Sequence, residues 1–154
     1  MHKPMFLAFA LTACLVTATA FAAEPAETLT PEEAWRDLPA YTYDQPRRLL
    51  RYLETEIQHA AGDEGRARAV ADRFAAVLEN PKATLDAKRF VCRWLPLVAT
   101  ESQVPVLARL LEKEETFEIA RQALQAIPGE ASANVLRGAL AEADGKKAIG
   151  LMGA

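Results

Sequence analysis

The chain has 154 residues, of which 51% are hydrophobic and 25% are charged, and its formal net charge is −3. This length and composition predict a single globular domain. A mildly acidic chain argues against general nucleic-acid binding, which relies on lysine and arginine to neutralise phosphates.

The first 22 residues have the pattern of a secretory signal peptide. His2 and Lys3 give a basic start, an apolar run follows, and small residues lead up to Ala22. We expect cleavage between Ala22 and Ala23 and a periplasmic or secreted mature chain. The strongly apolar run is shorter than the roughly 20 residues that a membrane span needs. Loss of Lys3 would leave 17 basic and 21 acidic residues, a net charge of −4.

A second interpretation of this segment stays open. The residues from Leu11 to Cys14 resemble the lipobox of bacterial lipoproteins, in which the cysteine is lipidated and becomes the new amino terminus. This alternative predicts a lipid-anchored envelope protein with a structural role, held at the membrane through Cys14 alone. The apolar residues that follow Cys14 argue against it. In either case Cys92 lies on an apolar helix, where a buried packing role is expected.

Residues 23–45 are expected to form a lead segment with one short helix. The run from Thr30 to Glu33 is a helix start, with a hydroxyl cap, a proline in the first turn and acids at the positive end of the helix dipole. Pro39 is expected to stop this helix.

Residues 46–154 are predicted to form a helical domain, because apolar residues recur every three or four positions. No segment alternates with a period of two, so the fold class is all-α. We expect Thr84, Ser102 and Thr116 to cap helices, and Pro96 to kink or end the helix that contains it. The expected helices cover 46–61, 64–79, 84–99, 102–114, 116–127, 130–143 and a stretch from about 146.

The second half of the chain repeats itself at a fixed offset. The segment from Phe90 to Thr100 aligns with 119–129, and VLARLL from Val106 aligns with VLRGAL from Val135, so both pairs share one 29-residue offset. This period predicts stacked helical hairpins, an α-solenoid of about six to seven helices. The clearest repeats cover 84–114 and 115–143, with a partial repeat at 145–154.

These repeats, with the AKRFVC segment from Ala87 and the AL-x-x-IPG run from Ala123, resemble the HEAT-repeat family. The resemblance is to its short bacterial form, found also in phycobilisome-lyase-like proteins. It implies an exported, non-catalytic scaffold that binds another protein, and it names no substrate. In a HEAT stack the second helix of each pair lines the concave side. Those helices expose Arg109, Lys113 and Arg137, and the hypothesis is that this basic strip contacts an acidic partner.

The third copy of the repeat breaks off near the end of the sequence. A further shift by the same offset makes 148–154 a first helix without its partner, with Ile149, Leu151 and Met152 facing water. Solenoids need a polar terminal cap to stay soluble. Either the chain is a truncated member of a longer array, or this C-terminal edge mediates self-association with another subunit.

The sequence contains no motif that carries enzyme chemistry. CxxC, GxGxxG, P-loop and GxSxG strings do not occur. His59 would be the lone histidine after signal cleavage, which excludes a two-histidine metal site. We therefore expect no catalytic, cofactor-binding or metal-binding residue. The alternative, a lyase-type enzyme or ligand binder, could draw its pocket only from Tyr41, Tyr43, Asp44 and His59.

Overall fold

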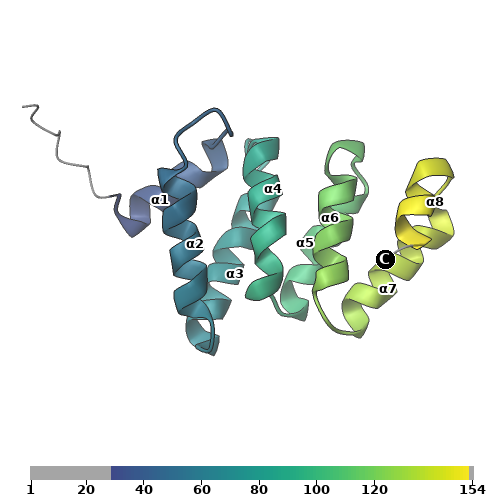
Figure 1. Ribbon diagram of the computed structural model, residues 1–154. Coiled ribbons are helices and arrows are strands. Elements are labelled where there is room, and N and C mark those ends of the chain that lie inside the picture. The colour runs from purple at the N-terminus through teal and green to yellow at the C-terminus, as the bar shows by residue number, and fades with distance from the viewer. Residues whose placement is uncertain (1–28, 153–154) are drawn as a thin grey trace, which may run out of the picture.

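The computed structural model describes residues 29–152, which form eight α-helices and no strand (Figure 1). The all-α prediction is confirmed. The seven helices expected in 46–154 and the short helix expected in the lead segment account for these eight. The helices are α1 Pro31–Asp37, α2 Arg48–Ala60, α3 Glu64–Glu79, α4 Leu85–Trp94, α5 Val104–Leu111, α6 Glu114–Ala126, α7 Glu130–Glu142 and α8 Gly145–Met152.

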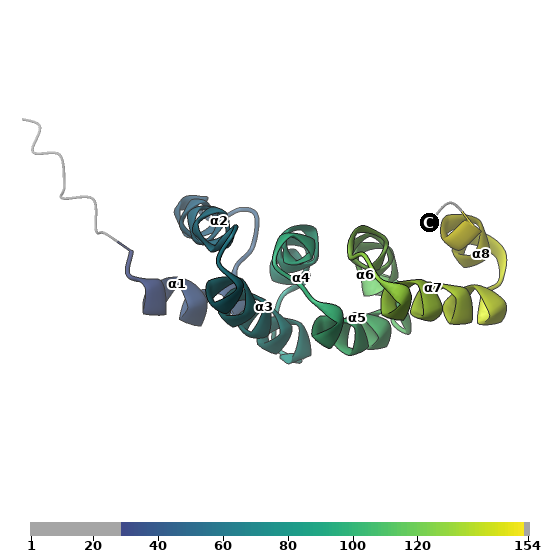
Figure 2. The same cartoon turned by 90° about the horizontal axis from the view of Figure 1, so that it is seen from below.

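The helices alternate between two rows. Figure 2 shows α2, α4, α6 and α8 in one row, and α1, α3, α5 and α7 in the other. Neighbours within a row pack together, as α4 does with α6 and α5 does with α3 and α7. The ends of both rows turn toward the side of α2 and α8 in this view, so the row of α2, α4, α6 and α8 lines the inner side of a shallow curve.

The spacing of the helices along the chain is nearly regular. Helices of the inner row begin at Arg48, Leu85, Glu114 and Gly145, so the last two steps are almost equal and the first is longer. The step from the start of α4 to the start of α6 equals the offset of the sequence repeat. The first step is longer because α3 has 16 residues, whereas α5 has 8.

Two helix starts follow the expected capping chemistry. The Thr30 hydroxyl accepts a hydrogen bond from the Glu33 backbone N–H at 3.3 Å, and the Glu33 carboxylate accepts one from the Thr30 N–H at 2.9 Å. The Thr84 hydroxyl accepts from the Ala87 N–H at 3.0 Å, and it donates to the carbonyl oxygen of Tyr41. Thr84 therefore caps α4 and also ties it to the segment before α2.

Two predicted caps are wrong, and one predicted break is confirmed. Thr100, not Ser102, caps the next element, a 3₁₀ turn at Glu101–Gln103 that precedes α5. Thr116 lies inside α6, where its buried hydroxyl donates to the Leu110 carbonyl oxygen at 2.7 Å. The helix that contains Pro96 ends early, because α4 stops at Trp94 and a 3₁₀ turn over Leu95–Leu97 follows.

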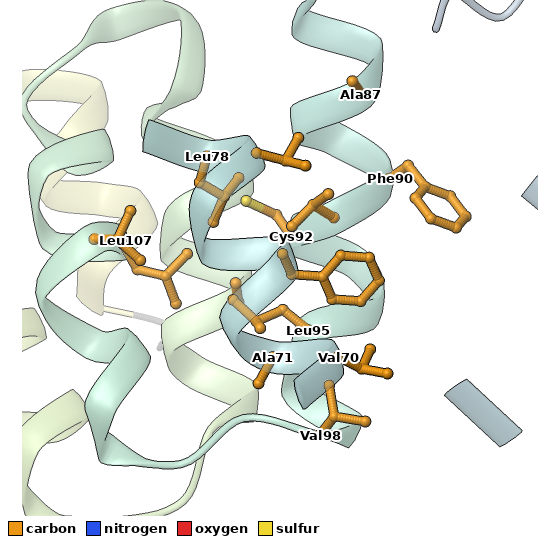
Figure 3. Packing of buried hydrophobic residues seen from close by; sticks show 14 of the residues in the cluster. Val70, Ala71, Leu78, Ala87, Phe90, Cys92, Leu95, Val98 and Leu107 are labelled. Atoms are coloured by element: carbon orange, nitrogen blue, oxygen red, sulfur yellow. The ribbon is translucent and has the colours of Figure 1, made fainter. Parts of the chain in front are cut away.

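One hydrophobic cluster runs from α1 to the end of α6. Its centre is a series of aromatic edge contacts, in which Phe74 lies 5.3 Å from Trp35 and 6.3 Å from Phe90, measured between ring centroids. Figure 3 shows side chains from α3, α4 and α5, among them Leu78, Cys92 and Leu107, packed in the same cluster. Each fully buried side chain of this size contributes about 1.5–3 kcal/mol relative to an exposed one.

The predicted signal peptide, its cleavage site at Ala22 and Ala23, and the alternative lipidation site at Cys14 lie outside the described residues. Among the helices of residues 29–152, none combines the length and the apolar character that a membrane crossing requires.

Candidate interaction surfaces

The predicted basic strip lies on α5 and α7 and on the short link between α5 and α6. Arg109 forms an ion pair with Glu79 of α3, and Arg137 lies 3.2 Å from a Glu130 carboxylate oxygen. Lys113 is exposed and precedes α6 directly. Both arginines thus have a carboxylate partner within the chain, so the strip offers less free positive charge than its sequence suggests.

The strip also lies on a different side from the one that the HEAT resemblance implies. Figure 2 places α5 and α7 in the outer row, and the inner side of the curve is lined by α2, α4, α6 and α8. The expectation that Arg109 and Arg137 line a concave surface is therefore corrected.

The residues considered for a ligand pocket do not converge. Tyr41 is buried, its hydroxyl donates to the Gln45 carbonyl oxygen at 3.4 Å, and burial raises its pKa. Tyr43 contacts its ring edge-on at 5.9 Å but is itself 53% exposed. His59 lines a separate groove with Trp35. Within the described residues, no group of three or more His, Cys, Asp or Glu side chains could hold a metal ion.

Cys92 occupies the buried packing position that the sequence predicts. Its side chain is buried in the hydrophobic cluster (Figure 3), and burial raises the pKa of the thiol to about 12, although the Lys88 ammonium opposes this. The thiolate, which is the reactive form, is thus disfavoured at neutral pH.

Two grooves on the inner row flank α4, and the sequence did not reveal them. The groove between α2 and α4 has a volume of about 350 Å³, and the groove between α4 and α6 about 380 Å³. Tyr43 and Arg93 line both grooves. Trp94 adds a half-buried ring to the first groove and Arg89 a guanidinium group to the second.

The arginines of these grooves differ in their electrostatic partners. Arg47 lies 3.5 Å from a Glu54 carboxylate oxygen, and Arg89 lies 3.2 Å from an Asp86 oxygen. Within the described residues, Arg93 makes no ion pair or hydrogen bond. The exposed guanidinium group of Arg93 therefore lies between the two grooves, and no carboxylate of the described residues forms an ion pair with it.

The spacing of Arg89 and Arg93 in the sequence indicates part of this surface. Residues four apart lie on one face of a helix, so both guanidinium groups project from the same side of α4. No local pattern indicates that Tyr43 joins them. Its backbone N–H donates to an Asp86 carboxylate oxygen at 3.1 Å, although the two residues lie far apart in the sequence.

A further cavity lies between α6, α7 and α8 and has a volume of about 540 Å³. The buried hydroxyl of Ser132 lines it and has no hydrogen-bond partner in the described part of the chain. Ile149 and Met152 are each 68% exposed, as expected, but Leu151 is buried, which corrects the expectation that it faces water. The C-terminal edge is therefore less apolar than the sequence suggested.

No family model, no curated protein and no solved structure matches this chain.

Proposed function

We propose that this protein is an exported, non-catalytic scaffold, an α-solenoid of short HEAT-like helical hairpins that binds another protein. The observation that carries the proposal is the alternation of helices between two rows at nearly regular spacing along the chain. Such stacks present an extended surface to a partner.

The pattern of helix contacts supports the solenoid interpretation. The main contacts join helices that are one or two apart along the chain, such as α5 with α6 and α4 with α6. In repeat proteins each unit contacts its neighbours and a single central core is not required. The strong packing of α5 along α6 also supports a hairpin unit that begins in the outer row, and in that register α7 pairs with α8.

The chemistry of the described residues supports a binding role over catalysis. The groups considered for an active site lie in separate places, with Tyr41 buried and His59 in a different groove from Tyr43. The Cys92 thiol is buried and its pKa is raised. Export is supported by the signal-peptide pattern of the first 22 residues.

Affinity capture from envelope extracts tests the proposal. The bait is the tagged mature chain, residues 23–154, and the matched control carries Leu107→Asp, which places a charge in the core because Leu107 is fully buried. We expect a partner that the folded chain retains and the control loses, and that binds again when both proteins are purified. Retention of the same proteins by both baits, or of none, contradicts the proposal.

Mass spectrometry of the natural amino terminus tests the route of export. A chain that begins at Ala23 supports a secreted or periplasmic protein. A lipidated Cys14 as the first residue supports the anchored form instead.

A further inference from the structure

We propose that the scaffold binds its partner through the surface of α4 that faces the inner side of the curve, and that the partner contributes an extended acidic segment. We call this surface the Arg93 face, and it comprises Tyr43, Arg47, Arg89, Arg93 and Trp94. The inference rests on the proposed scaffold function and specifies where the partner binds and with what chemistry.

The geometry of the Arg93 face suits an extended segment. Grooves of about 350 and 380 Å³ lie on either side of α4, and Arg93 and Tyr43 are common to both. A peptide that crosses α4 can place one side chain in each groove and a carboxylate at Arg93 between them.

Charge complementarity selects an acidic partner. Arg47 pairs with Glu54 of α2 and Arg89 with Asp86 of α4, whereas Arg93 has no carboxylate partner within the described residues. A guanidinium group presents a planar fork of donors that matches a carboxylate in bidentate geometry. The outer-row arginines Arg109 and Arg137 already face carboxylates of the chain itself.

The aromatic side chains of the Arg93 face are held in place before a partner binds. The Tyr43 backbone is fixed by Asp86, and its ring rests edge-on against buried Tyr41. The Trp94 ring packs against Phe90 with 6.3 Å between centroids. Aromatic residues and arginine are enriched among the residues that dominate binding energy, and ordering them in advance lowers the entropic cost of association.

A protein segment fits these features better than a nucleic acid or an anionic membrane. Nucleic-acid and membrane surfaces reward many basic groups together, because each neutralised phosphate adds to affinity. The chain has a net charge of −3, and the Arg93 face mixes its arginines with Glu54 and Asp86. One free guanidinium group between two grooves matches a carboxylate flanked by apolar side chains.

Fluorescence anisotropy tests the inference with a labelled peptide of alternating glutamate and leucine as the probe. Its control replaces every glutamate by glutamine. The protein variants are Arg93→Ala, Arg93→Lys and Tyr43→Ala, and the matched control is Arg109→Ala, which removes an exposed arginine from the outer row. Circular dichroism of each variant verifies the fold.

We expect the wild-type chain to bind the acidic peptide and to bind the glutamine peptide at least about tenfold more weakly, which corresponds to about 1.4 kcal/mol. Arg93→Ala and Tyr43→Ala should each weaken binding by about tenfold, Arg93→Lys by less, and Arg109→Ala by under about twofold. No binding by wild type, equal binding of both peptides, or equal effects of Arg93→Ala and Arg109→Ala overturns the inference. Binding of an oligonucleotide or of phosphatidylglycerol vesicles through Arg93, without peptide binding, overturns it as well.

A second measurement separates this inference from the scaffold function on which it rests. The captured partner of the wild-type chain is presented to the Arg93→Ala variant. Loss of capture supports the Arg93 face. Undiminished capture refutes the Arg93 face and leaves the scaffold function standing, whereas a wild-type chain that captures nothing refutes the scaffold function itself.

Discussion

The centre of the described chain and its C-terminal end are built from the same kind of helix but differ in how many residues they bury. Helix α4 buries five residues, with Phe90 and Val91 among them, whereas Ser132 is the one buried residue of α7. Among the described side chains of α8, Leu151 alone is buried. The edge-to-face and tilted ring pairs that link Trp35, Phe74, Phe90 and Trp94 join α1, α3 and α4. The difference indicates that stability is graded along the chain and falls toward α8.

The cause is side-chain size at equivalent positions. Trp94 of α4 corresponds to Ala123 of α6 at the 29-residue offset, and α7 is rich in alanine and carries Gly138. Small side chains bury less apolar area, so each contact contributes less free energy. The helices at the C-terminal end of the described chain should therefore be less stable than those at its centre.

Removal of the aromatic ring of Phe74 should lower the unfolding free energy by the largest amount among the changes proposed here. Phe74 is fully buried between Trp35 and Phe90, so Phe74→Ala should cost about 3–5 kcal/mol of unfolding free energy. Leu140→Ala, at a half-buried position of α7, should cost about 1 kcal/mol. Urea denaturation followed by circular dichroism measures both. Similar costs would show that burial is not graded as described.

Hydrogen exchange should show the gradient directly. Amides of α3 and α4 should exchange only through global unfolding, whereas those of α8 should exchange about 100-fold faster through local opening. Mass spectrometry of exchanged peptides measures this ratio. Uniform protection from α3 to α8 would contradict the comparison.

Replacement of two glycines near the C-terminal end of the described chain by alanine should change the stability in opposite directions. Gly129 has φ of 125°, and an added Cβ would lie 2.7 Å from a Glu101 carboxylate oxygen, so Gly129→Ala should cost about 1–3 kcal/mol. Gly138 lies inside α7 with open space around it, so Gly138→Ala should add about 0.5–1 kcal/mol of stability. Thermal unfolding of both variants is the measurement. A loss of stability in the Gly138 variant would mean that α7 is more tightly packed than described.

Acid should weaken α8 slightly through Glu118. Hydrogen bonds from Arg121 and Gln122 hold the pKa of this carboxyl below its usual value, although burial opposes them. Arg121 lies under α8, where its side chain passes 3.7 Å from the position of a Cβ on Gly150. The contribution of the ionised Glu118 carboxylate to stability is therefore fully present above its unfolded-state pKa of about 4.3. It is lost as the pH falls through the lower pKa of the folded state.

The size of this acid effect should be below about 1 kcal/mol, because the Glu118 side chain is 56% exposed. Exchange of α8 amides between pH 5 and pH 3 measures it, after correction for the intrinsic pH dependence. Glu118→Gln should flatten the response, and Glu142→Gln, at an exposed position of α7, should not. An unchanged response in the Glu118 variant would assign the acid sensitivity to another group.

The sequence predicts the helices well and their ends less well. Apolar periodicity locates the helices from α2 to α7, because burial on one face is a property of contiguous residues. The capping pattern at Thr30 locates α1, and the repeat offset locates α8. Thr116 was misplaced as a cap, because its hydroxyl reaches the Leu110 carbonyl oxygen from inside α6. The cap on Thr100 was missed because Ser102, two residues later, has the same local chemistry.

The candidate site was less predictable than the fold. Free and neutralised arginines look alike in sequence, since Arg109 and its ion-pair partner Glu79 lie on different helices. The spacing of Arg89 and Arg93 was visible, but their position beside Tyr43 depends on how the segment before α2 packs on α4. That contact runs through Asp86 and Thr84.

The sequence by itself determined the all-α class, the 29-residue spacing between α4 and α6, and the buried position of Cys92. These properties follow from periodicity and from the chemistry of neighbouring residues. Only the tertiary structure decided which row each helix joins, which arginines keep an unpaired charge, and where Tyr43 lies. Those outcomes depend on contacts between residues far apart in the chain, which local patterns do not encode.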